Sequence, residues 1–333
     1  MTGPDFTPPN RRGRLGAARD RVVGAVMDPT VAGSFGRGGF RRHARGFVPG
    51  DLDVDLTGRV ALVTGGHSGI GRAAAAALAC RGAEVRLLGR NPARVEAAVE
   101  ALRQETGNPN VRAEHLDVSD LDAIRDLAGR LDTPRIDILV HNAGVLPDVR
   151  QESPQGHETT LATHVLGPFL LTRLMLPRLQ AAPDGRVIWV SSGGMYSRRL
   201  SLADPEWRTR PYDGVVAYAE TKRMQVVLSR LWAGRLRGTT VTSNAMHPGW
   251  VDTGAVKTSL PRFHRVMGPF LREAAEGADT IVWLATANRL KGVAGHFWFD
   301  REARREYWLP GTRETPEEAE ALWSFCERLT ESA

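Results

Sequence analysis

The segment spanning residues 59–81 constrains the fold of this chain more than any other. Residues 59–64 (RVALVT) predict a short buried strand, and residues 72–81 predict an Ala-rich helix. The glycine-rich turn GGHSGIG joins them at residues 65–71. Glycines allow a tight turn and a close approach of backbone to a ligand, and the free N–H groups of a helix N-terminus face that ligand. A strand, a glycine-rich turn and a helix in this order are typical of a dinucleotide-binding unit.

The glycine spacing at this turn is Gly-x-x-x-Gly-x-Gly rather than the commoner Gly-x-Gly-x-x-Gly, so an ordinary turn is the alternative. If the turn binds a dinucleotide, the residues expected to contact it are Gly65, Ser68, Gly69, Ile70 and Gly71.

Strands and helices continue to alternate along the chain. Further strands are expected at residues 84–88, 111–116, 136–140, 186–190, 240–245 and 295–299. Further helices are expected after the caps Asn91 and Ser119, at residues 154–180, 213–236 and 273–286, and from Thr315 onward. This alternation predicts an α/β fold: a single doubly wound parallel-sheet (Rossmann) domain with helices on both faces.

The net charge of +6 belongs to the first 50 residues. Residues 1–50 hold 9 Arg and 3 Asp, whereas residues 51–333 hold 35 Lys and Arg against 35 Asp and Glu. We therefore divide the chain into a basic N-terminal extension, residues 1–50, and a Rossmann domain, residues 51–333. Residues 1–20 are rich in Pro, Gly and Arg and are expected to be partly disordered. Residues 20–50 either make a weak peripheral membrane contact or, as we prefer, pack on the domain or on a partner subunit.

Composition narrows the class of protein further. The domain has no basic stripe interleaved with aromatic residues, so we expect no nucleic-acid partner. No apolar run approaches the length of a membrane span, so stable insertion is not expected. Cys80 and Cys326 form no disulfide framework or metal-ligand spacing. We expect a cytoplasmic homo-oligomer in a reducing compartment, acting on a small-molecule substrate.

Distinctive motifs follow the carboxyl ends of the predicted strands. In doubly wound sheets, ligands bind beyond those ends, so the motifs should converge on one crevice. The candidate cofactor-binding residues there are Asp117 and Val118, Asn142, Ala143 and Gly144, and Pro248, Gly249, Val251 and Thr253. The Asp117 carboxylate could accept a hydrogen bond from an adenine amino group. Each motif taken alone could equally be ordinary turn chemistry.

Tyr218 and Lys222 are four residues apart in a predicted helix and therefore lie on one face of it. A fixed positive charge lowers the pKa of a neighbouring phenol, which suits it to exchange a proton while a hydride moves elsewhere. The chain has 3 Lys and 41 Arg, and a planar guanidinium does not replace a compact ammonium within a site. The alternative is a solvated helix face that happens to carry a Tyr.

Taken in order, these motifs resemble the short-chain dehydrogenase/reductase family. The matching positions are Thr64 to Gly71, Asp117, Asn142-Ala143-Gly144, Ser192, Tyr218-x-x-x-Lys222, and Pro248-Gly249 with Thr253. The resemblance implies a nicotinamide-dependent oxidoreductase whose catalytic residues are Ser192, Tyr218 and Lys222. Tyr218 would donate or take the proton, Lys222 would bind the ribose hydroxyls and lower the pKa of Tyr218, and Ser192 would polarise the substrate oxygen.

Two positions depart from the family pattern. His164 stands where the family has an Asn on the long helix, and His141 stands for the first Asn of Asn-Asn-Ala-Gly. If the family's Asn acts through its backbone carbonyl, His164 is compatible with turnover; if its side chain acts, the proton relay is impaired. The second case would make the protein a cofactor-binding regulator or sensor with little or no turnover.

The second predicted strand indicates which nicotinamide cofactor is bound. In a dinucleotide fold, a carboxylate near the end of this strand accepts from the ribose 2′-hydroxyl. Here that position is Gly89, and residues 85–95 contain no acid. Arg90 follows directly and Arg94 comes one turn later, and a guanidinium binds a phosphate well. NADP(H) is therefore the expected cofactor, with NAD(H) possible.

Five apolar residues are expected to border the crevice. They are Met195, Tyr196, Trp207, Trp250 and Phe263. An apolar pocket would suit a lipophilic carbonyl or alcohol, but the same residues could be ordinary core or dimer contacts.

Overall fold

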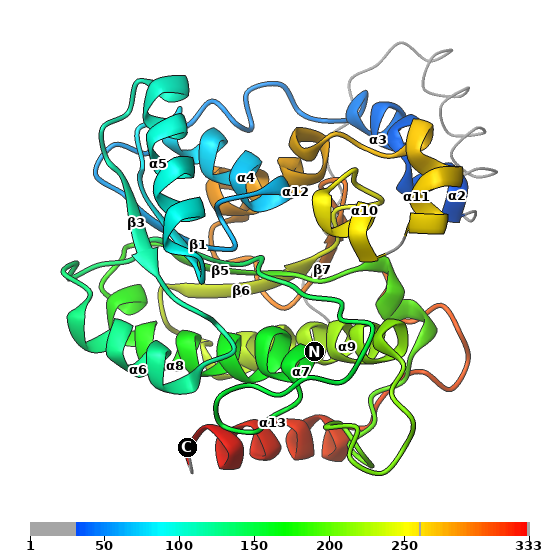
Figure 1. The fold of residues 1–333 in the computed structure, drawn as a ribbon. Helices are drawn as coiled ribbons and strands as arrows, with labels where there is room; N and C mark the ends of the chain where they lie inside the picture. The colour runs from blue at the N-terminus through cyan, green and yellow to red at the C-terminus, as the bar shows by residue number, and fades with distance from the viewer. Residues whose placement is uncertain (1–30, 260, 332–333) are drawn as a thin grey trace.

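The computed structural model describes residues 31–259 and 261–331. Their strands form one sheet in the order β3-β2-β1-β4-β5-β6-β7-β8 (Figure 1). The strands are β1 (Val60–Thr64), β2 (Glu84–Gly89), β3 (Val111–His115), β4 (Ile138–His141), β5 (Gly185–Val190), β6 (Val241–Met246), β7 (Phe297–Phe299) and β8 (Glu302–Ala303). All pairings from β3 to β7 are parallel, and only the short edge strand β8 is antiparallel. The chain order reverses between β1 and β4, which is where a doubly wound sheet opens its binding crevice.

Helices cover both faces of this sheet (Figure 1). The longer ones are α4 (Gly69–Ala79), α5 (Pro92–Thr106) and α12 (Ala274–Thr286) on one face, and α6 (Leu121–Arg130), α8 (Gly167–Gln180), α9 (Gly214–Arg235) and α13 (Pro316–Glu331) on the other. The strand residues alternate between the two layers: Leu62 packs in the core beneath α8 and α9, whereas Ala61 and Val63 pack in the core beneath α4. A strand buried on both faces is typical of a parallel sheet. The structure confirms the predicted doubly wound Rossmann domain.

Short helices complete the described chain. They are α2 (Val31–Phe35), α3 (Arg37–Ala44), α7 (Thr159–Leu161), the π-helix η1 (Ala162–Leu166), the 3₁₀-helix η2 (Gly193–Ser197), α10 (Gly254–Ser259), α11 (Pro261–Met267), and the 3₁₀-helices η3 (Gly268–Phe270) and η4 (Asn288–Leu290).

Two local predictions were wrong. The helix expected from residue 154 begins only at Thr159 and passes through η1 before α8. The cap of α6 is Asp120, whose side chain accepts from the amides of Asp122 and Ala123. Ser119 cannot serve as the cap because its amide and hydroxyl both donate to Asp117, which holds the preceding turn.

The described part of the N-terminal extension packs on the domain. Phe35 is 3 % exposed and contacts Trp250 and Phe299 in edge-to-face geometry. The buried Arg272 guanidinium donates to the carbonyl oxygen of Ser34 at 3.0 Å and to that of Phe35 at 2.8 Å. For Ser34 and Phe35 the structure shows the packing on the domain that we preferred for residues 20–50, whereas residues 20–30 lie outside the described residues. The disorder expected for residues 1–20 lies outside the described residues.

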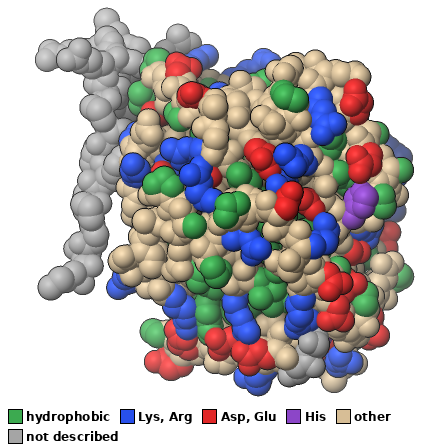
Figure 2. Space-filling view, turned by 90° about the vertical axis from the view of Figure 1, so that its left-hand side faces the viewer, with side chains coloured by type: hydrophobic (Ala, Val, Ile, Leu, Met, Phe, Trp, Pro, Cys, Tyr) green, Lys and Arg blue, Asp and Glu red, His purple; other side chains and the backbone are tan. Residues whose placement is uncertain are grey.

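The outer surface agrees with the balanced numbers of basic and acidic residues in residues 51–333. Figure 2 shows Lys and Arg interspersed with Asp and Glu over the face that it presents. Cys80 is exposed, Cys326 is buried, and both are free thiols. Within residues 31–259 and 261–331, we find no helix that is both long enough and apolar enough to cross a membrane.

Candidate active site

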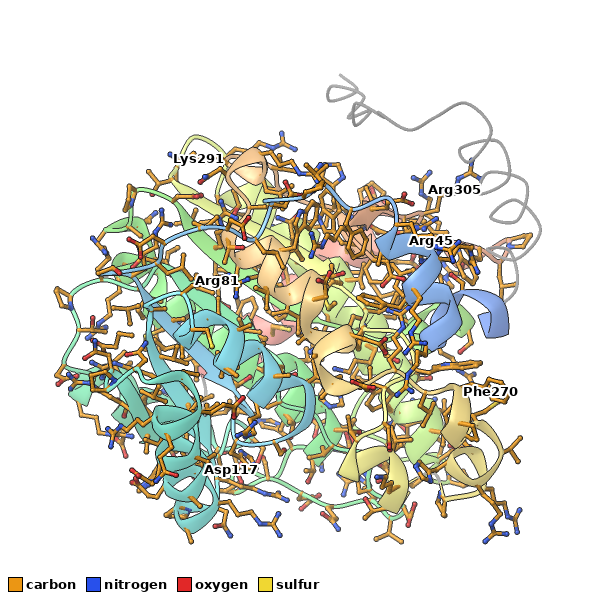
Figure 3. The ribbon with its side chains drawn as sticks, turned by 90° about the horizontal axis from the view of Figure 1, so that it is seen from above. Arg45, Arg81, Asp117, Phe270, Lys291 and Arg305 are labelled. Atoms are coloured by element: carbon orange, nitrogen blue, oxygen red, sulfur yellow. The ribbon has the colours of Figure 1, made fainter. Side chains whose placement is uncertain are left out.

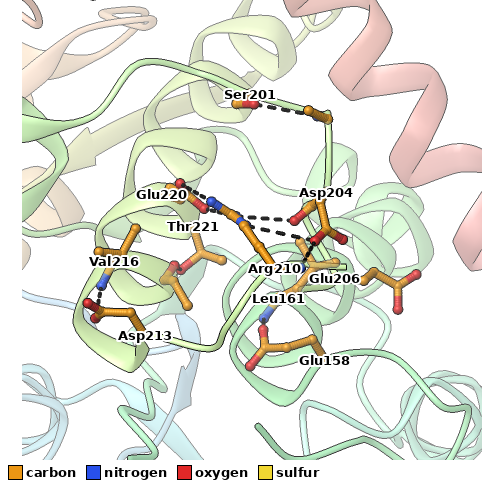
Figure 4. Close-up of polar contacts among 12 residues, drawn as sticks. Glu158, Leu161, Ser201, Asp204, Glu206, Arg210, Asp213, Val216, Glu220 and Thr221 are labelled. Atoms are coloured by element: carbon orange, nitrogen blue, oxygen red, sulfur yellow. Dashed lines mark hydrogen bonds and ion pairs between the residues drawn. The ribbon is translucent and has the colours of Figure 1, made fainter. Parts of the chain in front are cut away.

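The first turns of α9 are held in place by polar contacts (Figure 4). The Asp213 side chain caps the helix by accepting from the Val216 amide at 3.0 Å. Glu220, which lies inside the Tyr-x-x-x-Lys motif, pairs with Arg210 at 2.6 Å. The Arg210 guanidinium also stacks on the Trp207 ring, 3.5 Å from its centroid. These contacts fix the helix segment that carries Tyr218.

Tyr218 and Ser192 lie side by side, because α9 packs against the η2 segment that follows β5. Desolvation raises the pKa of Tyr218 above its ordinary value, and a hydrogen bond with the Ser192 side chain acts in the opposite direction. We expected the Lys222 charge to lower this pKa. In the structure, burial of the phenol is the dominant influence on this pKa and outweighs the Ser192 hydrogen bond, and Lys222 is not among its causes.

Lys222 is buried on the same face of α9. Its Nζ lies 5.4 Å from the centroid of the Tyr218 ring. It donates to the carbonyl oxygen of Val190 at 2.8 Å and to Gln225 Oε1 at 3.0 Å. Burial lowers the pKa of Lys222 to about 7, so its charge can change near neutral pH.

His164 lies in η1, and its imidazole is held at both nitrogens. Nε2 accepts from the Val145 amide at 3.0 Å, and Nδ1 lies 2.8 Å from Thr221 Oγ1. The Thr221 hydroxyl donates to the backbone carbonyls of α9, so it accepts from His164 Nδ1–H. Burial, assisted by the Lys222 charge, lowers the pKa of His164 well below its usual value. The ring is therefore neutral and stands edge-on to Tyr218 at 5.3 Å between centroids.

His141, the other departure, is a core residue. Its Nε2 lies 2.7 Å from Thr172 Oγ1, and its ring packs 4.5 Å from that of Trp189. Burial lowers its pKa to about 3, so it is neutral.

The glycine-rich turn has the shape that a pyrophosphate requires. Gly65 and Gly69 have φ of 65° and 52°, which glycine adopts without strain. A Cβ on Gly71 would lie 2.3 Å from Asn142 Nδ2, so only glycine allows this approach. Gly69, Ile70 and Gly71 open α4 after its cap residue Ser68, and their N–H groups have no partner within the helix. These residues fit a bound dinucleotide.

The motif after β4 is joined to this turn. Thr64 Oγ1 accepts from the amides of Asn142 and Ala143, and Asn142 Nδ2 donates to the Thr64 carbonyl oxygen at 2.9 Å. A Cβ on Gly144 would lie 3.2 Å from His164 Nε2 and 3.9 Å from Lys222 Nζ. Asn142-Ala143-Gly144 therefore links the glycine-rich turn to the Tyr218–Lys222 pair.

The loop after β6 reaches the glycine-rich turn from the other side. A Cβ on Gly69 would lie 3.3 Å from Thr253 Cγ2, so Thr253 borders the turn. Gly249 has φ of 78° and packs against Arg272, which also contacts the Pro248 carbonyl oxygen. Val251 is buried against Gly277, so its side chain belongs to the core rather than to the crevice.

Asp117 and Val118 lie farther along the same edge of the sheet. Asp117 Oδ1 accepts from the Ser119 amide at 2.9 Å and from its hydroxyl at 2.7 Å. The Val118 carbonyl oxygen packs against Gly167, where a Cβ would clash. In Figure 3, Asp117 lies near the bottom of the view and Lys291 near the top. The adenine contact expected of Asp117 stays a prediction.

His67 was not among our candidates, yet it lies beside Arg90 and Arg94 at the end of β2. Burial lowers the pKa of His67, and the charges of Arg94 and Arg90 add to the effect. A Cβ on Gly89 would lie 2.8 Å from His67 Nδ1. That nitrogen is buried and has no hydrogen-bond partner among the described residues. Its place within the glycine-rich turn was the sequence signal that could have identified it.

Of the five apolar residues expected to border the crevice, three are core residues. Met195, Tyr196 and Trp207 are buried. Trp250 and Phe263 are partly exposed, and their ring centroids lie 5.2 Å apart. The sequence analysis did not include Trp308 among these apolar residues. Trp308 is exposed, and its ring stacks on that of Tyr196 with centroids 3.9 Å apart.

Comparison with known proteins gives the family. A profile described as short chain dehydrogenase matches residues 59–262. Dehydrogenase/reductase SDR family member 12 of Bos taurus is 38 % identical over 88 % of this chain and 93 % of its own length. Retinol dehydrogenase 12 of Homo sapiens is 36 % identical over 83 % of this chain and 88 % of its own. The chain belongs to the short-chain dehydrogenase/reductase family, as the motifs predicted.

Solved structures agree with this assignment. A short chain dehydrogenase from Escherichia coli CFT073, crystallised with NADPH, superposes with a TM-score of 0.62 at 26 % identity. The match covers 75 % of this chain and 99 % of that one. A short chain dehydrogenase from Shigella flexneri superposes with a TM-score of 0.61 at 26 % identity, covering 79 % of this chain and 96 % of its own. NAD(P)-dependent oxidoreduction is thus the general activity of the fold and family found here.

Proposed function

We propose that this protein is an NADP(H)-dependent oxidoreductase that interconverts a carbonyl and an alcohol on a lipophilic small molecule. The observation that carries the proposal is the meeting of Tyr218, Ser192 and Lys222 beside the glycine-rich turn. The nicotinamide supplies the hydride chemistry when bound. The glycine-rich turn and the loop that contains Thr253 would hold it from two sides.

Within this site each side chain has a distinct role. Ser192, hydrogen-bonded to Tyr218, would hold the substrate oxygen and stabilise the charge that develops on it. Tyr218 would move the proton at its hydroxyl group. Lys222 would bind the ribose and, when charged, favour the phenolate, each pKa unit being worth about 1.4 kcal/mol.

The preference for NADP(H) is supported by the end of β2. Arg90, Arg94 and the buried Nδ1 of His67 lie together there, and the expected carboxylate position is Gly89. Guanidinium and imidazole groups bind phosphate, whereas a carboxylate would repel it. The Escherichia coli relative was crystallised with NADPH.

The lipophilic substrate class is supported by two observations. Trp250 and Phe263 place partly exposed rings on the segment that follows β6. Several relatives are named retinol dehydrogenases, and apolar linings are usual in pockets for such ligands.

The experiment is an NADPH oxidation assay with a panel of ketones and aldehydes, comparing wild type with Tyr218→Phe. The variant keeps the ring but loses the proton, so turnover should fall about 10²- to 10⁴-fold while the Kd for NADPH stays the same. Tyr212→Phe is the control, because the Tyr212 hydroxyl donates to Glu158 rather than to Ser192. NADPH binding without turnover of any compound would favour the regulator or sensor instead, and an active Tyr218→Phe enzyme would refute the assigned role.

A further inference from the structure

Gln225 is a buried amide that none of the roles above requires. It lies on α9 three residues after Lys222, hence on the same face of the helix, and it is 0 % exposed. Gln225 Oε1 lies 3.0 Å from Lys222 Nζ, and Gln225 Nε2 lies 2.9 Å from the carbonyl oxygen of His164. One side chain thus connects the ammonium of the proposed active site to the backbone of η1.

The chemistry of its neighbours determines the orientation of this amide. An ammonium only donates and a backbone carbonyl only accepts. Turning the amide by 180° would set its N–H groups against Lys222 and its oxygen against the carbonyl of His164. The oxygen of Gln225 must therefore face Lys222, which is the arrangement that stabilises the charged form of the lysine.

The sequence of the preceding helix explains why the His164 carbonyl can accept from Gln225. In an α-helix this carbonyl would accept from the amide of residue 168. Residue 168 is Pro, which has no N–H. The helix instead widens into η1 at this point. Because Pro168 has no N–H, the His164 carbonyl oxygen can accept from a donor on another element. Gln225 on α9 supplies that donor through its Nε2.

Two of the three N–H donors of Lys222 are used by acceptors within the protein, Val190 O and Gln225 Oε1. With two directions fixed, the ammonium cannot rotate freely beside Tyr218. We propose that Gln225 is a positioning residue, which holds the Lys222 ammonium in place for the oxidoreductase proposed above and ties it to the backbone of η1. This inference rests on that proposed function only for its catalytic consequence, since the hydrogen-bonded link can be tested without turnover.

The test is an NMR titration of lysine side chains in the full-length protein labelled with ¹³C-lysine. The chain has only Lys222, Lys257 and Lys291, so three Cε signals report all the lysines. Loss of the amide oxygen in Gln225→Leu should lower the pKa of Lys222 by about one to two units, the size expected for a hydrogen bond to a charged group. In Gln225→Glu, a carboxylate beside the ammonium should raise it. Ser229→Ala, a buried position on α9 bonded to Ser243, is the control and should leave it unchanged.

Opposite shifts in the two variants would establish the positioning role, because a general loss of packing would not change sign. A Lys222 pKa that is the same in wild type and in both variants would overturn the inference, whatever the activity. If Gln225→Leu does not fold, Gln225→Glu carries the test, since Glu keeps the size of Gln and the oxygen that faces Lys222, although it loses the donor to the His164 carbonyl. If both variants shift the pKa of Lys222 but the wild-type protein turns over no substrate, the result supports the positioning role of Gln225 and counts against the proposed oxidoreductase. With a substrate, Gln225→Leu should lower kcat more than it raises KM and move the pH profile toward acid.

Discussion

The imidazole Nε2 of His164 accepts a hydrogen bond from the amide of Val145 at 3.0 Å. This contact ties the departure from the family pattern to the segment directly after Asn142-Ala143-Gly144. The His164 side chain is thereby occupied in holding the backbone, while its carbonyl oxygen contacts Gln225. A relay that uses the carbonyl of this position is compatible with histidine.

We therefore expect His164→Leu to be more damaging to stability than His164→Asn. Leu leaves the Val145 amide without an acceptor, which should lower the free energy of unfolding by about 1–3 kcal/mol, whereas Asn retains a polar side chain. His164→Asn should keep turnover within about tenfold, or 1.4 kcal/mol, of wild type. Urea unfolding and NADPH oxidation measure the two effects. Complete loss of turnover in His164→Asn, with the fold intact, would show that the imidazole itself takes part in the chemistry.

Arg90→Ala should weaken NADPH binding about 10- to 100-fold, because a hydrogen bond to a charged group contributes about 1.5–3 kcal/mol. NADH lacks the 2′-phosphate, so its Kd should change little. Arg112→Ala is the control, since Arg112 lies near the start of β3, at the opposite end of the sheet from the crevice. Equal losses for NADPH and NADH would contradict the assignment of Arg90.

A substitution at Gly89 is a less direct test of cofactor choice. A Cβ there would lie 2.7 Å from Val95 and 2.8 Å from His67, so Gly89→Asp displaces neighbours as well as adding a charge. His67→Gln is the better companion to Arg90→Ala. It should weaken NADPH binding more than NADH binding, as measured by titration of each cofactor.

Binding of the cofactor should take up protons near neutral pH. Burial lowers the pKa of Lys222 to about 7 in the free protein, and ribose hydroxyls accepting from the ammonium would raise it. Between the two pKa values the complex binds more protons than the free protein, so affinity should fall as the pH rises above about 7. Calorimetry in buffers of different ionisation enthalpy measures the uptake. Lys222→Met should take up fewer protons than wild type; the same uptake in both would exclude Lys222 as the source.

The N-terminal segment should contribute to stability and to the site. Phe35 is buried against Gly193, next to Ser192, and Phe35→Ala should cost about 3–5 kcal/mol of unfolding free energy. Phe47→Ala is the control, because Phe47 is only partly buried and contacts Arg301 at 4.2 Å. Chemical denaturation compares the two variants. A Phe35→Ala cost no larger than that of Phe47→Ala would show that this segment is a dispensable arm.

The packing of Ser34 and Phe35 on the domain also predicts the effect of deleting N-terminal residues. An extension separate from the domain, as the division at residue 50 implies, could be deleted without loss of the fold, but Ser34 and Phe35 supply acceptors to the buried Arg272 guanidinium. Deletion of residues 1–45 should therefore lower the melting temperature below that of the full chain. Equal melting temperatures for the full chain and this truncation would show that the packing of Ser34 and Phe35 is dispensable.

The sequence by itself determined the fold class, the family and most element positions. Strands such as β1 and helices such as α5, with Asn91 as cap and Pro92 as first residue, follow from local patterns of burial and capping. The Tyr218–Lys222 pair was also readable, because four-residue spacing on a helix places both side chains on one face. These features depend on residues close together in the chain.

Only the tertiary structure decided the contacts between distant segments. The links from Gln225 to His164 and from Phe35 to Gly193 join residues far apart in sequence, and no local periodicity encodes them. The pKa of Tyr218 was predicted in the wrong direction for the same reason. Desolvation depends on how elements from the whole chain pack around the phenol and around Lys222. The four-residue spacing specified which two groups share a face, and the packing around them set their protonation.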